Sequence, residues 1–150
     1  MAERPVSIRI SESVRVAIAE IARRAKRGFS SIVNEMLEEG ARMRRIPGVD
    51  FADEFEHREA KVGGTGLGVW EVVAAYQRMG EDWERFKKHY KNWLNEFQLR
   101  AALAYWRAYP EEIDGLIAES YCWTPEKLYS TYPFMKPPEP GSATKRIAER

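Results

Sequence analysis

Hydrophobic and polar positions alternate between residues 5 and 10. As a strand, this segment has one apolar and one polar face, with Val6, Ile8 and Ile10 on the first and Pro5, Ser7 and Arg9 on the second. A single strand is not stable alone, so we expect it to pair antiparallel with the same strand of a second chain. The homodimer would bury the apolar face and expose Ser7 and Arg9 on a two-stranded ribbon, which fits a DNA major groove.

Helical spacing replaces alternation after residue 10. The apolar positions of the first expected helix are Val14, Ile18, Ile21, Ala22 and Ala25. Ser11 or Ser13 is expected to cap this helix, and Gly28 to end it. Ser30 is expected to cap a second helix, which turns Val33, Met36 and Leu37 inward. The unpaired N–H groups at its start would form a seat for a phosphate.

The run Ile8-Arg9-Ile10-Ser11-Glu12-Ser13-Val14, followed by Gly28-Phe29-Ser30, makes residues 4–45 resemble the ribbon-helix-helix repressors of the CopG, Arc and MetJ type. The resemblance implies a dimer that reads operator DNA with its ribbon and clamps the DNA backbone at the start of the second helix. The implied DNA-binding residues are Arg4, Pro5, Ser7, Arg9, Ser30 and Ser31. The alternative is an edge strand packed on a helical hairpin inside an ordinary domain, with Arg9 merely solvated.

The charge distribution divides the chain into unlike parts. Residues 1–48 hold ten Lys/Arg and six Asp/Glu, a net charge of +4, whereas the whole chain carries +1. Residues 49–120 hold nine Lys/Arg and fourteen Asp/Glu, a net charge of −5. Positive charge is concentrated where phosphate would lie. We expect a dimerisation and DNA-binding module over 1–46, a helical domain over 47–120 and a partner-binding tail over 121–150.

The middle of the chain predicts a short β-hairpin and then helices, so the expected fold class is mainly α. The expected strands are 49–51 and 58–62, and the expected helices are 69–79, 82–90, 95–109 and 110–120. Large apolar residues recur there at helical spacing, which is more typical of a core than of a ligand site. They are Trp70, Trp83, Phe86, Phe97, Leu103, Tyr105 and Trp106.

The glycines between residues 63 and 68 do not form a nucleotide-binding motif. Val69 stands where the third glycine of a dinucleotide fingerprint would be, and no Lys-Ser or Lys-Thr follows. A turn with positive backbone angles is the better explanation.

Three motifs in this region are similar to domain-of-unknown-function family 433. They are Gly64-Thr65-Gly66-Leu67-Gly68-Val69-Trp70, Leu99-Arg100-Ala101-Ala102-Leu103-Ala104-Tyr105 and Tyr109-Pro110-Glu111-Glu112-Ile113-Asp114. The resemblance covers residues 48–119 and implies a small helix-turn-helix-like module associated with VapB-type antitoxins, with 82–90 and 95–109 as the helix pair. Glu96 at the start of the second helix opposes phosphate, which favours dimerisation or partner binding over DNA contact, despite Lys87, Lys88 and Lys91 nearby.

No catalytic constellation emerges from the sequence. His57 lies among Glu54, Glu56 and Glu59, but the other histidine, His89, is not at a metal-ligand spacing from it. No nucleophile has a base nearby. We therefore expect neither an enzyme nor a bound cofactor or metal.

The last thirty residues combine aromatic rings with prolines. Prolines this dense disfavour a long helix, and aromatics this dense are unusual in a disordered tail. We expect an extended segment that lies across a partner, with Trp123, Tyr129, Tyr132 and Phe134 as anchors. The alternative is that it folds back over its own domain or a dimer mate.

Antitoxins with these modules join an amino-terminal DNA-binding dimer to a carboxy-terminal segment that covers a toxin, and the toxin implied is a PIN-like ribonuclease. Such nucleases hold a divalent metal with clustered carboxylates, which Lys145, Arg146 or Arg150 could neutralise. The resemblance thus implies an antitoxin that represses its own operon, as a homodimer or in a higher oligomer with the toxin. The alternatives are a ribbon-helix-helix regulator without a toxin, whose second module oligomerises or senses a ligand, and a scaffold without DNA binding.

Composition narrows the compartment. The chain has 150 residues, 44% of them apolar, and a low mean hydropathy, so no membrane span is expected. Cys122 has no partner for an internal disulfide, and the residues after Met1 include no apolar signal region. We expect a cytoplasmic protein.

Overall fold

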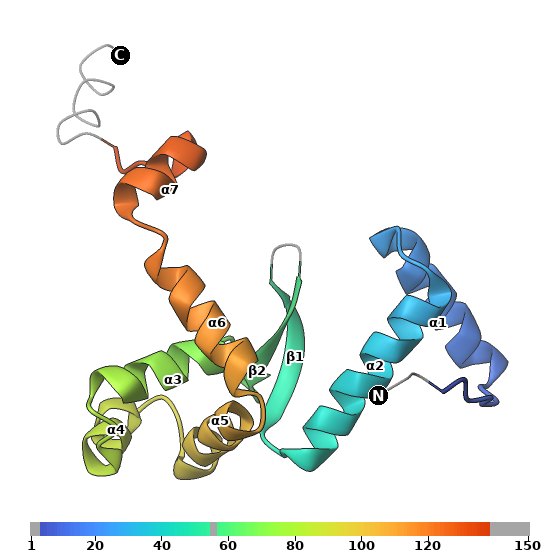
Figure 1. The fold of residues 1–150 in the computed structure, drawn as a ribbon, viewed down its shortest axis with the longest axis horizontal. Helices are drawn as coiled ribbons and strands as arrows, with labels where there is room; N and C mark the ends of the chain where they lie inside the picture. Colours follow the sequence, from blue (N-terminus) through green and yellow to red (C-terminus); the bar gives the residue numbers. More distant parts are fainter. Residues whose placement is uncertain (1–3, 55–56, 139–150) are drawn as a thin grey trace, which may run out of the picture.

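The computed structural model describes residues 4–54 and 57–138, and Figure 1 shows their arrangement. This part of the chain is mainly helical with one two-stranded antiparallel sheet, which confirms the expected class. The elements are α1 (Glu12–Ala25), α2 (Phe29–Arg45), β1 (Val49–Glu54), β2 (His57–Val62), α3 (Val69–Arg78), α4 (Trp83–Tyr90), α5 (Glu96–Ala108), α6 (Pro110–Tyr121), α7 (Pro125–Thr131) and a short 3₁₀ helix, η1 (Pro133–Met135). The four helices expected between residues 69 and 120 are confirmed to within one residue at each end.

The helices α1 and α2 form a hairpin at the right of Figure 1. The hydroxyl of Ser11 accepts a hydrogen bond from the N–H of Val14 at 3.4 Å and caps α1, as one of the two expected caps. The expected stop at Gly28 is wrong. Lys26 ends α1 in the left-handed conformation, with φ 52°, whereas Gly28 is extended and precedes α2 as its N-cap. The tight turn needs one left-handed residue, and Lys26 already supplies it.

The β-hairpin and helices α3 to α6 share one hydrophobic core and together form the middle domain. The helix α5 runs through its centre and contacts α3, α6 and both strands. Of the large residues expected in the core, Phe86, Leu103 and Tyr105 are buried, and the indoles of Trp70, Trp83 and Trp106 pack partly buried against them. The strands pair from Val49 opposite Val62 to Glu54 opposite His57, which makes the hairpin longer than expected.

Phe97 is not a core residue, contrary to expectation, because 60% of it is exposed. Its ring lies beside Gly48, at the turn from α2 to β1. A Cβ atom at Gly48 would stand 2.8 Å from Cε1 of Phe97 and 2.9 Å from Cβ of Ala101, and φ of Gly48 is 99°. The turn therefore requires glycine for both its backbone angle and its space.

Two ion-pair clusters attach the second half of α2 to the middle domain. Arg42 of α2 donates hydrogen bonds to the phenol of Tyr105 at 2.7 Å and to the carboxylate of Glu112 at 2.6 Å. Arg58 of β2 pairs with Glu39 of α2 at 2.9 Å. These contacts fix the direction in which α2 leaves the middle domain.

The described part of the tail is not extended between residues 125 and 135, contrary to expectation. It forms α7 and η1, which project from the end of α6 in Figure 1. Thr124 caps α7 through a hydrogen bond from the N–H of Lys127 to its hydroxyl, and Pro125 occupies the first helical position. Proline is compatible with that position because the first N–H of a helix has no intrahelical acceptor.

None of the helices in the described ranges combines the length and the apolar character that crossing a bilayer requires.

Candidate nucleic-acid interface

The segment before α1 carries four of the expected DNA-binding residues, Arg4, Pro5, Ser7 and Arg9. Residues 4–11 belong to no helix or strand in the single chain, and residues 4–10 are all exposed. Val6 is 80% exposed and Ile8 54%. The apolar side chains of this segment are therefore in contact with solvent in the single chain. The pairing of this segment with a second copy stays a prediction, and it would bury these side chains.

The α1–α2 hairpin buries only a few of its apolar residues. Its buried residues are Ile18, Ala22 and Ile32, with Val33 packed against them. A larger set of apolar side chains stays exposed on the segment and the two helices: Val6, Ile8, Ile10, Val14, Val16, Ile21, Phe29, Met36, Leu37 and Met43. Exposed apolar side chains in such number are typical of a surface that associates with another chain. Met36 and Leu37 do not face inward in this chain, contrary to expectation, because the small hairpin core leaves both exposed.

The start of α2 holds the other two expected residues, Ser30 and Ser31. Ser30 does not cap the helix as expected. Gly28 is the N-cap, no side chain caps the first turn, and that turn contains no acidic residue. Arg27 donates to the hydroxyl of Ser31 at 2.8 Å and pairs with Glu35 at 2.7 Å. Uncapped N–H groups beside a guanidinium favour an anion at this position.

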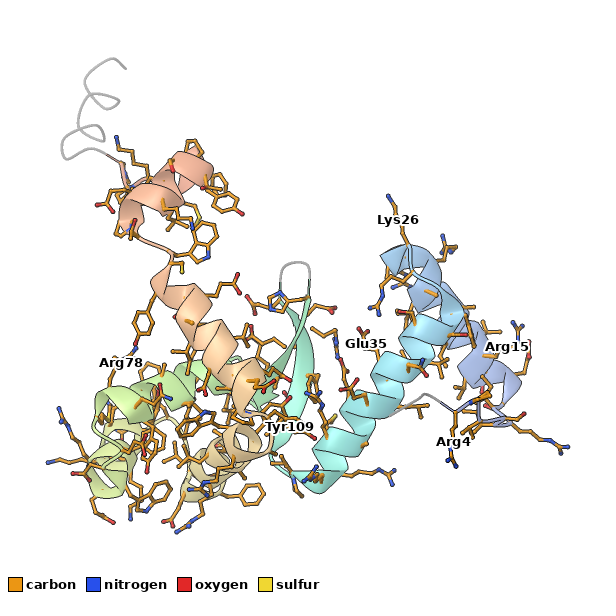
Figure 2. The ribbon with its side chains drawn as sticks, viewed as in Figure 1. Arg4, Arg15, Lys26, Glu35, Arg78 and Tyr109 are labelled. Atoms are coloured by element: carbon orange, nitrogen blue, oxygen red, sulfur yellow. The ribbon has the colours of Figure 1, made fainter. Side chains whose placement is uncertain are left out.

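One chain does not bring the two halves of the expected interface together. Figure 2 places Arg4 and Lys26 at opposite ends of the α1–α2 hairpin, and Lys26 adjoins the start of α2. A continuous DNA-contacting surface would therefore need residues from two chains.

The helix α5 is poorly placed to enter a DNA groove. One face of it is buried in the core. Its first turn is used internally, because Gln98 and Asn95 cap each other's backbone and the amide of Gln98 donates to the carbonyl of Gly63 at 3.0 Å. Glu96 in the same turn pairs with Arg100 at 2.6 Å. The helices α4 and α5 form where they were expected, but their formation does not indicate that they bind DNA.

A charged cluster on the β-hairpin joins His57, Glu54 and Glu59, which lie close together in the sequence, to Lys61, which was not expected to take part. Lys61 and Glu59 are both buried and lie 2.8 Å apart, and Lys61 also binds Glu54 at 2.7 Å. The indole of Trp70 donates to Glu59 at 3.1 Å, and Nε2 of His57 lies 3.4 Å from the other oxygen of that carboxylate. Alternate positions 57, 59 and 61 share one face of β2, which is the signal that could have revealed the cluster.

Lys61 supplies one positive charge to the two carboxylates of this cluster. Burial lowers the pKa of Lys61, but hydrogen bonds to Glu54 and Glu59 outweigh it, so the pKa lies above its usual value. The hydrogen bond from Lys61 lowers the pKa of Glu54. Because an ammonium group already occupies both carboxylates, the cluster serves to hold the hairpin together. Glu56, the remaining acidic residue of the region, lies outside the described residues.

The tail gathers three of its four expected aromatic anchors into one exposed cluster. The rings of Trp123 and Tyr132 stack with centroids 6.1 Å apart, and Phe134 meets Tyr132 edge-on at 6.0 Å. Phe134 is 84% exposed, and Tyr129 is half-buried. The basic anchors Lys145, Arg146 and Arg150 lie outside the described residues.

Comparisons with family models, with curated proteins and with solved structures find no match to this chain.

Proposed function

We propose that this chain is the antitoxin of a toxin–antitoxin pair. Its amino-terminal segment and the α1–α2 hairpin form a ribbon-helix-helix dimer that binds operator DNA and represses its own operon. Its tail binds and inhibits a PIN-like ribonuclease. The middle domain, with α4 and α5 as a helix-turn-helix-like pair, connects the two activities.

The apolar surface of the first 45 residues is the observation that carries the DNA-binding half of the proposal. The side chains of Val6 and Ile8 alternate with those of Ser7 and Arg9, and none of these four is buried in the single chain. Antiparallel pairing of two copies would remove the apolar side chains from water. The same pairing would leave two copies of Ser7 and Arg9 on the outer face, where they would meet the edges of bases.

Electrostatics supports DNA as the ligand of that face. The net charge of +4 in residues 1–48 contrasts with −5 in residues 49–120, so the proposed DNA-binding module attracts phosphate more strongly than the middle domain does. The uncapped start of α2 adds N–H donors for a backbone phosphate.

The aromatic cluster of the tail supports a protein ligand for the other half. Trp123, Tyr132 and Phe134 cluster where the two ends of α7 and the start of η1 meet, and aromatic rings are common anchors of protein interfaces. The choice of a PIN-like ribonuclease rests on the resemblance of residues 48–119 to modules associated with VapB-type antitoxins.

The decisive experiment compares Arg9→Ala with Arg15→Ala in gel shifts on the DNA immediately upstream of this chain's own gene. Arg15 is also exposed but pairs with Glu12 on α1, so it serves as the matched control. Loss of a bidentate guanine contact costs roughly 1–3 kcal/mol per copy, and the dimer has two copies. We expect Arg9→Ala to weaken binding at least about thirtyfold, with an unchanged circular dichroism spectrum, and Arg15→Ala to weaken it much less. Equal affinities for the two variants would exclude the ribbon as the DNA-reading element.

A further inference from the structure

A cavity of about 470 Å³ lies on the outer side of α5, lined by Tyr76, Trp83, Arg100, Leu103, Ala104 and Arg107. These residues come from α3, α4 and α5, which lie at the opposite end of the molecule from the α1–α2 hairpin in Figure 1. The volume is in the range of small-molecule sites. The cavity shares no residue with the proposed DNA-binding surface or the tail.

Two guanidinium groups give the cavity a positive charge. Arg100 and Arg107 are seven positions apart on α5, so two helical turns place them on the same face. Arg107 is exposed and forms no ion pair within the described ranges. Arg100 pairs with Glu96, but both side chains are more than half exposed, at 65% and 51%. Ion pairs between exposed side chains contribute little, so a bound anion can replace Glu96.

The remaining walls are aromatic and apolar. The guanidinium of Arg100 lies 4.9 Å from the ring centroid of Trp83, and the ammonium of Lys87 lies 5.7 Å from the same ring. Tyr76 is held against the core by Phe86, with ring centroids 4.9 Å apart. Ala104 lines the cavity between the two arginines, so its small side chain leaves the space open.

We propose that this cavity binds a small organic anion with a flat apolar body. The carboxylate or phosphate group lies between Arg100 and Arg107, and the ring lies against Trp83 and Leu103. Planar guanidinium groups match either anion with paired hydrogen bonds, and the aromatic wall selects a flat ring over an inorganic ion. The proposal is independent of the antitoxin function and assigns the middle domain a ligand of its own.

The test uses 1-naphthoate and 1-naphthyl phosphate as the two anionic probes, with 1-naphthol and inorganic phosphate as partial analogues. Isothermal titration calorimetry of the full-length protein should give one site per chain for at least one anionic probe. The probe that binds more tightly shows whether the site prefers a carboxylate or a phosphate. Both partial analogues should bind at least tenfold more weakly. No saturable binding of either naphthyl anion at millimolar concentration would overturn the proposal, as would equal binding of 1-naphthol or of inorganic phosphate.

Substitutions of residues that line the cavity test whether the probe binds there. Arg107→Met should weaken binding at least tenfold, and Ala104→Phe should abolish it by filling the space. Arg85→Met removes an exposed cation of α4 that does not line the cavity and should leave affinity unchanged. Circular dichroism melts establish that each variant is folded, and Arg107→Met keeps the test valid should Ala104→Phe lose stability. Unchanged affinity in Arg107→Met would exclude this site.

Discussion

Arg42 and Tyr105 are hydrogen-bonded across the junction between α2 and α5, with Nη1 of Arg42 2.7 Å from the phenolic oxygen. The phenol donates its proton to Oε1 of Glu112 at 2.8 Å, and Arg42 donates to Oε2 of the same carboxylate at 2.6 Å. Three helices thus meet in one closed set of hydrogen bonds around a buried ring. Any change in the direction of α2 would break that set.

Replacement of Arg42 by methionine should destabilise the protein. The substitution keeps an unbranched apolar stem but leaves Tyr105 and Glu112 without their charged donor, which costs about 1–3 kcal/mol in a partly buried site. Arg44→Met is the control, since Arg44 is exposed on the same helix and should change the free energy of unfolding by less than about 0.5 kcal/mol. Urea unfolding followed by circular dichroism measures both. Equal urea midpoints for Arg42→Met and Arg44→Met would show that the hydrogen bonds of Arg42 contribute nothing to stability.

The same network predicts a loss of stability in alkali. Burial, followed by the hydrogen bond to Glu112, raises the pKa of Tyr105 above its usual value of 10.0, although Arg42 opposes the shift. Above pH 10 the unfolded chain releases this proton while the folded chain retains it, so the free energy of unfolding should fall as pH rises. Lys61 and Tyr90, whose pKa values are also raised, act in the same direction.

The Tyr105→Phe variant isolates the contribution of this phenol. It should be less stable at neutral pH but should lose less stability between about pH 9 and about pH 11, because it lacks the group that the unfolded chain ionises. Urea unfolding at a series of pH values compares the two proteins. Parallel profiles would show that Tyr105 ionises at the same pH in both states.

The helices of the middle domain could be predicted because local signals and burial agree there. Asn95 starts α5 with a reciprocal cap, and Pro110 starts α6 at the first helical position. Elsewhere a local preference was overridden. Lys26 took the left-handed position expected of Gly28, and α7 fits between Pro125 and Pro133 although dense prolines suggested extended chain.

The charged junctions could not be predicted because their partners are distant in sequence. Arg42 and Glu112 are 70 positions apart, and nothing near Arg42 distinguishes it from the exposed Arg44. The burial of Glu59 and Lys61 could not be predicted either, because it depends on how Trp70 and Glu54 fold over them. The proposed DNA-reading residues Ser7 and Arg9, in contrast, are identified from local sequence alone, because they occupy the polar positions of an alternating segment.

Substitution at Ile8 tests the dimer proposed for the amino-terminal segment. Ile8→Lys would place an unpaired charge in the buried face of the ribbon, which costs several kcal/mol and should weaken dimerisation more than about a hundredfold. Ser7→Lys puts the same charge on the opposite face and should remain dimeric. Sedimentation equilibrium across a concentration series gives the dimer dissociation constants of both variants. A dimer of undiminished affinity in Ile8→Lys would place the interface elsewhere.

Removal of residues 123–150 should separate the two proposed activities. The cut leaves the amino-terminal segment, α1, α2 and the middle domain whole, so affinity for the upstream DNA should not change. Binding to the proposed partner, a PIN-like ribonuclease, should fall steeply, because the aromatic cluster is lost. Gel shifts and calorimetry measure the two affinities on the same preparation. A truncated chain that still binds and silences the ribonuclease would assign inhibition to the middle domain.

A single substitution, Phe134→Ala, sharpens this prediction. Phe134 is 84% exposed, so its ring contributes little to folding, and a loss of ribonuclease binding in the variant cannot come from unfolding. A central aromatic anchor is worth about 2 kcal/mol or more, which corresponds to about a thirtyfold weaker complex. Tyr121→Ala is the matched control, because Tyr121 is also exposed but ends α6 outside the cluster. If both variants bind as the parent chain does, the ring of Phe134 is not an anchor, and the contact must be made by other parts of the tail.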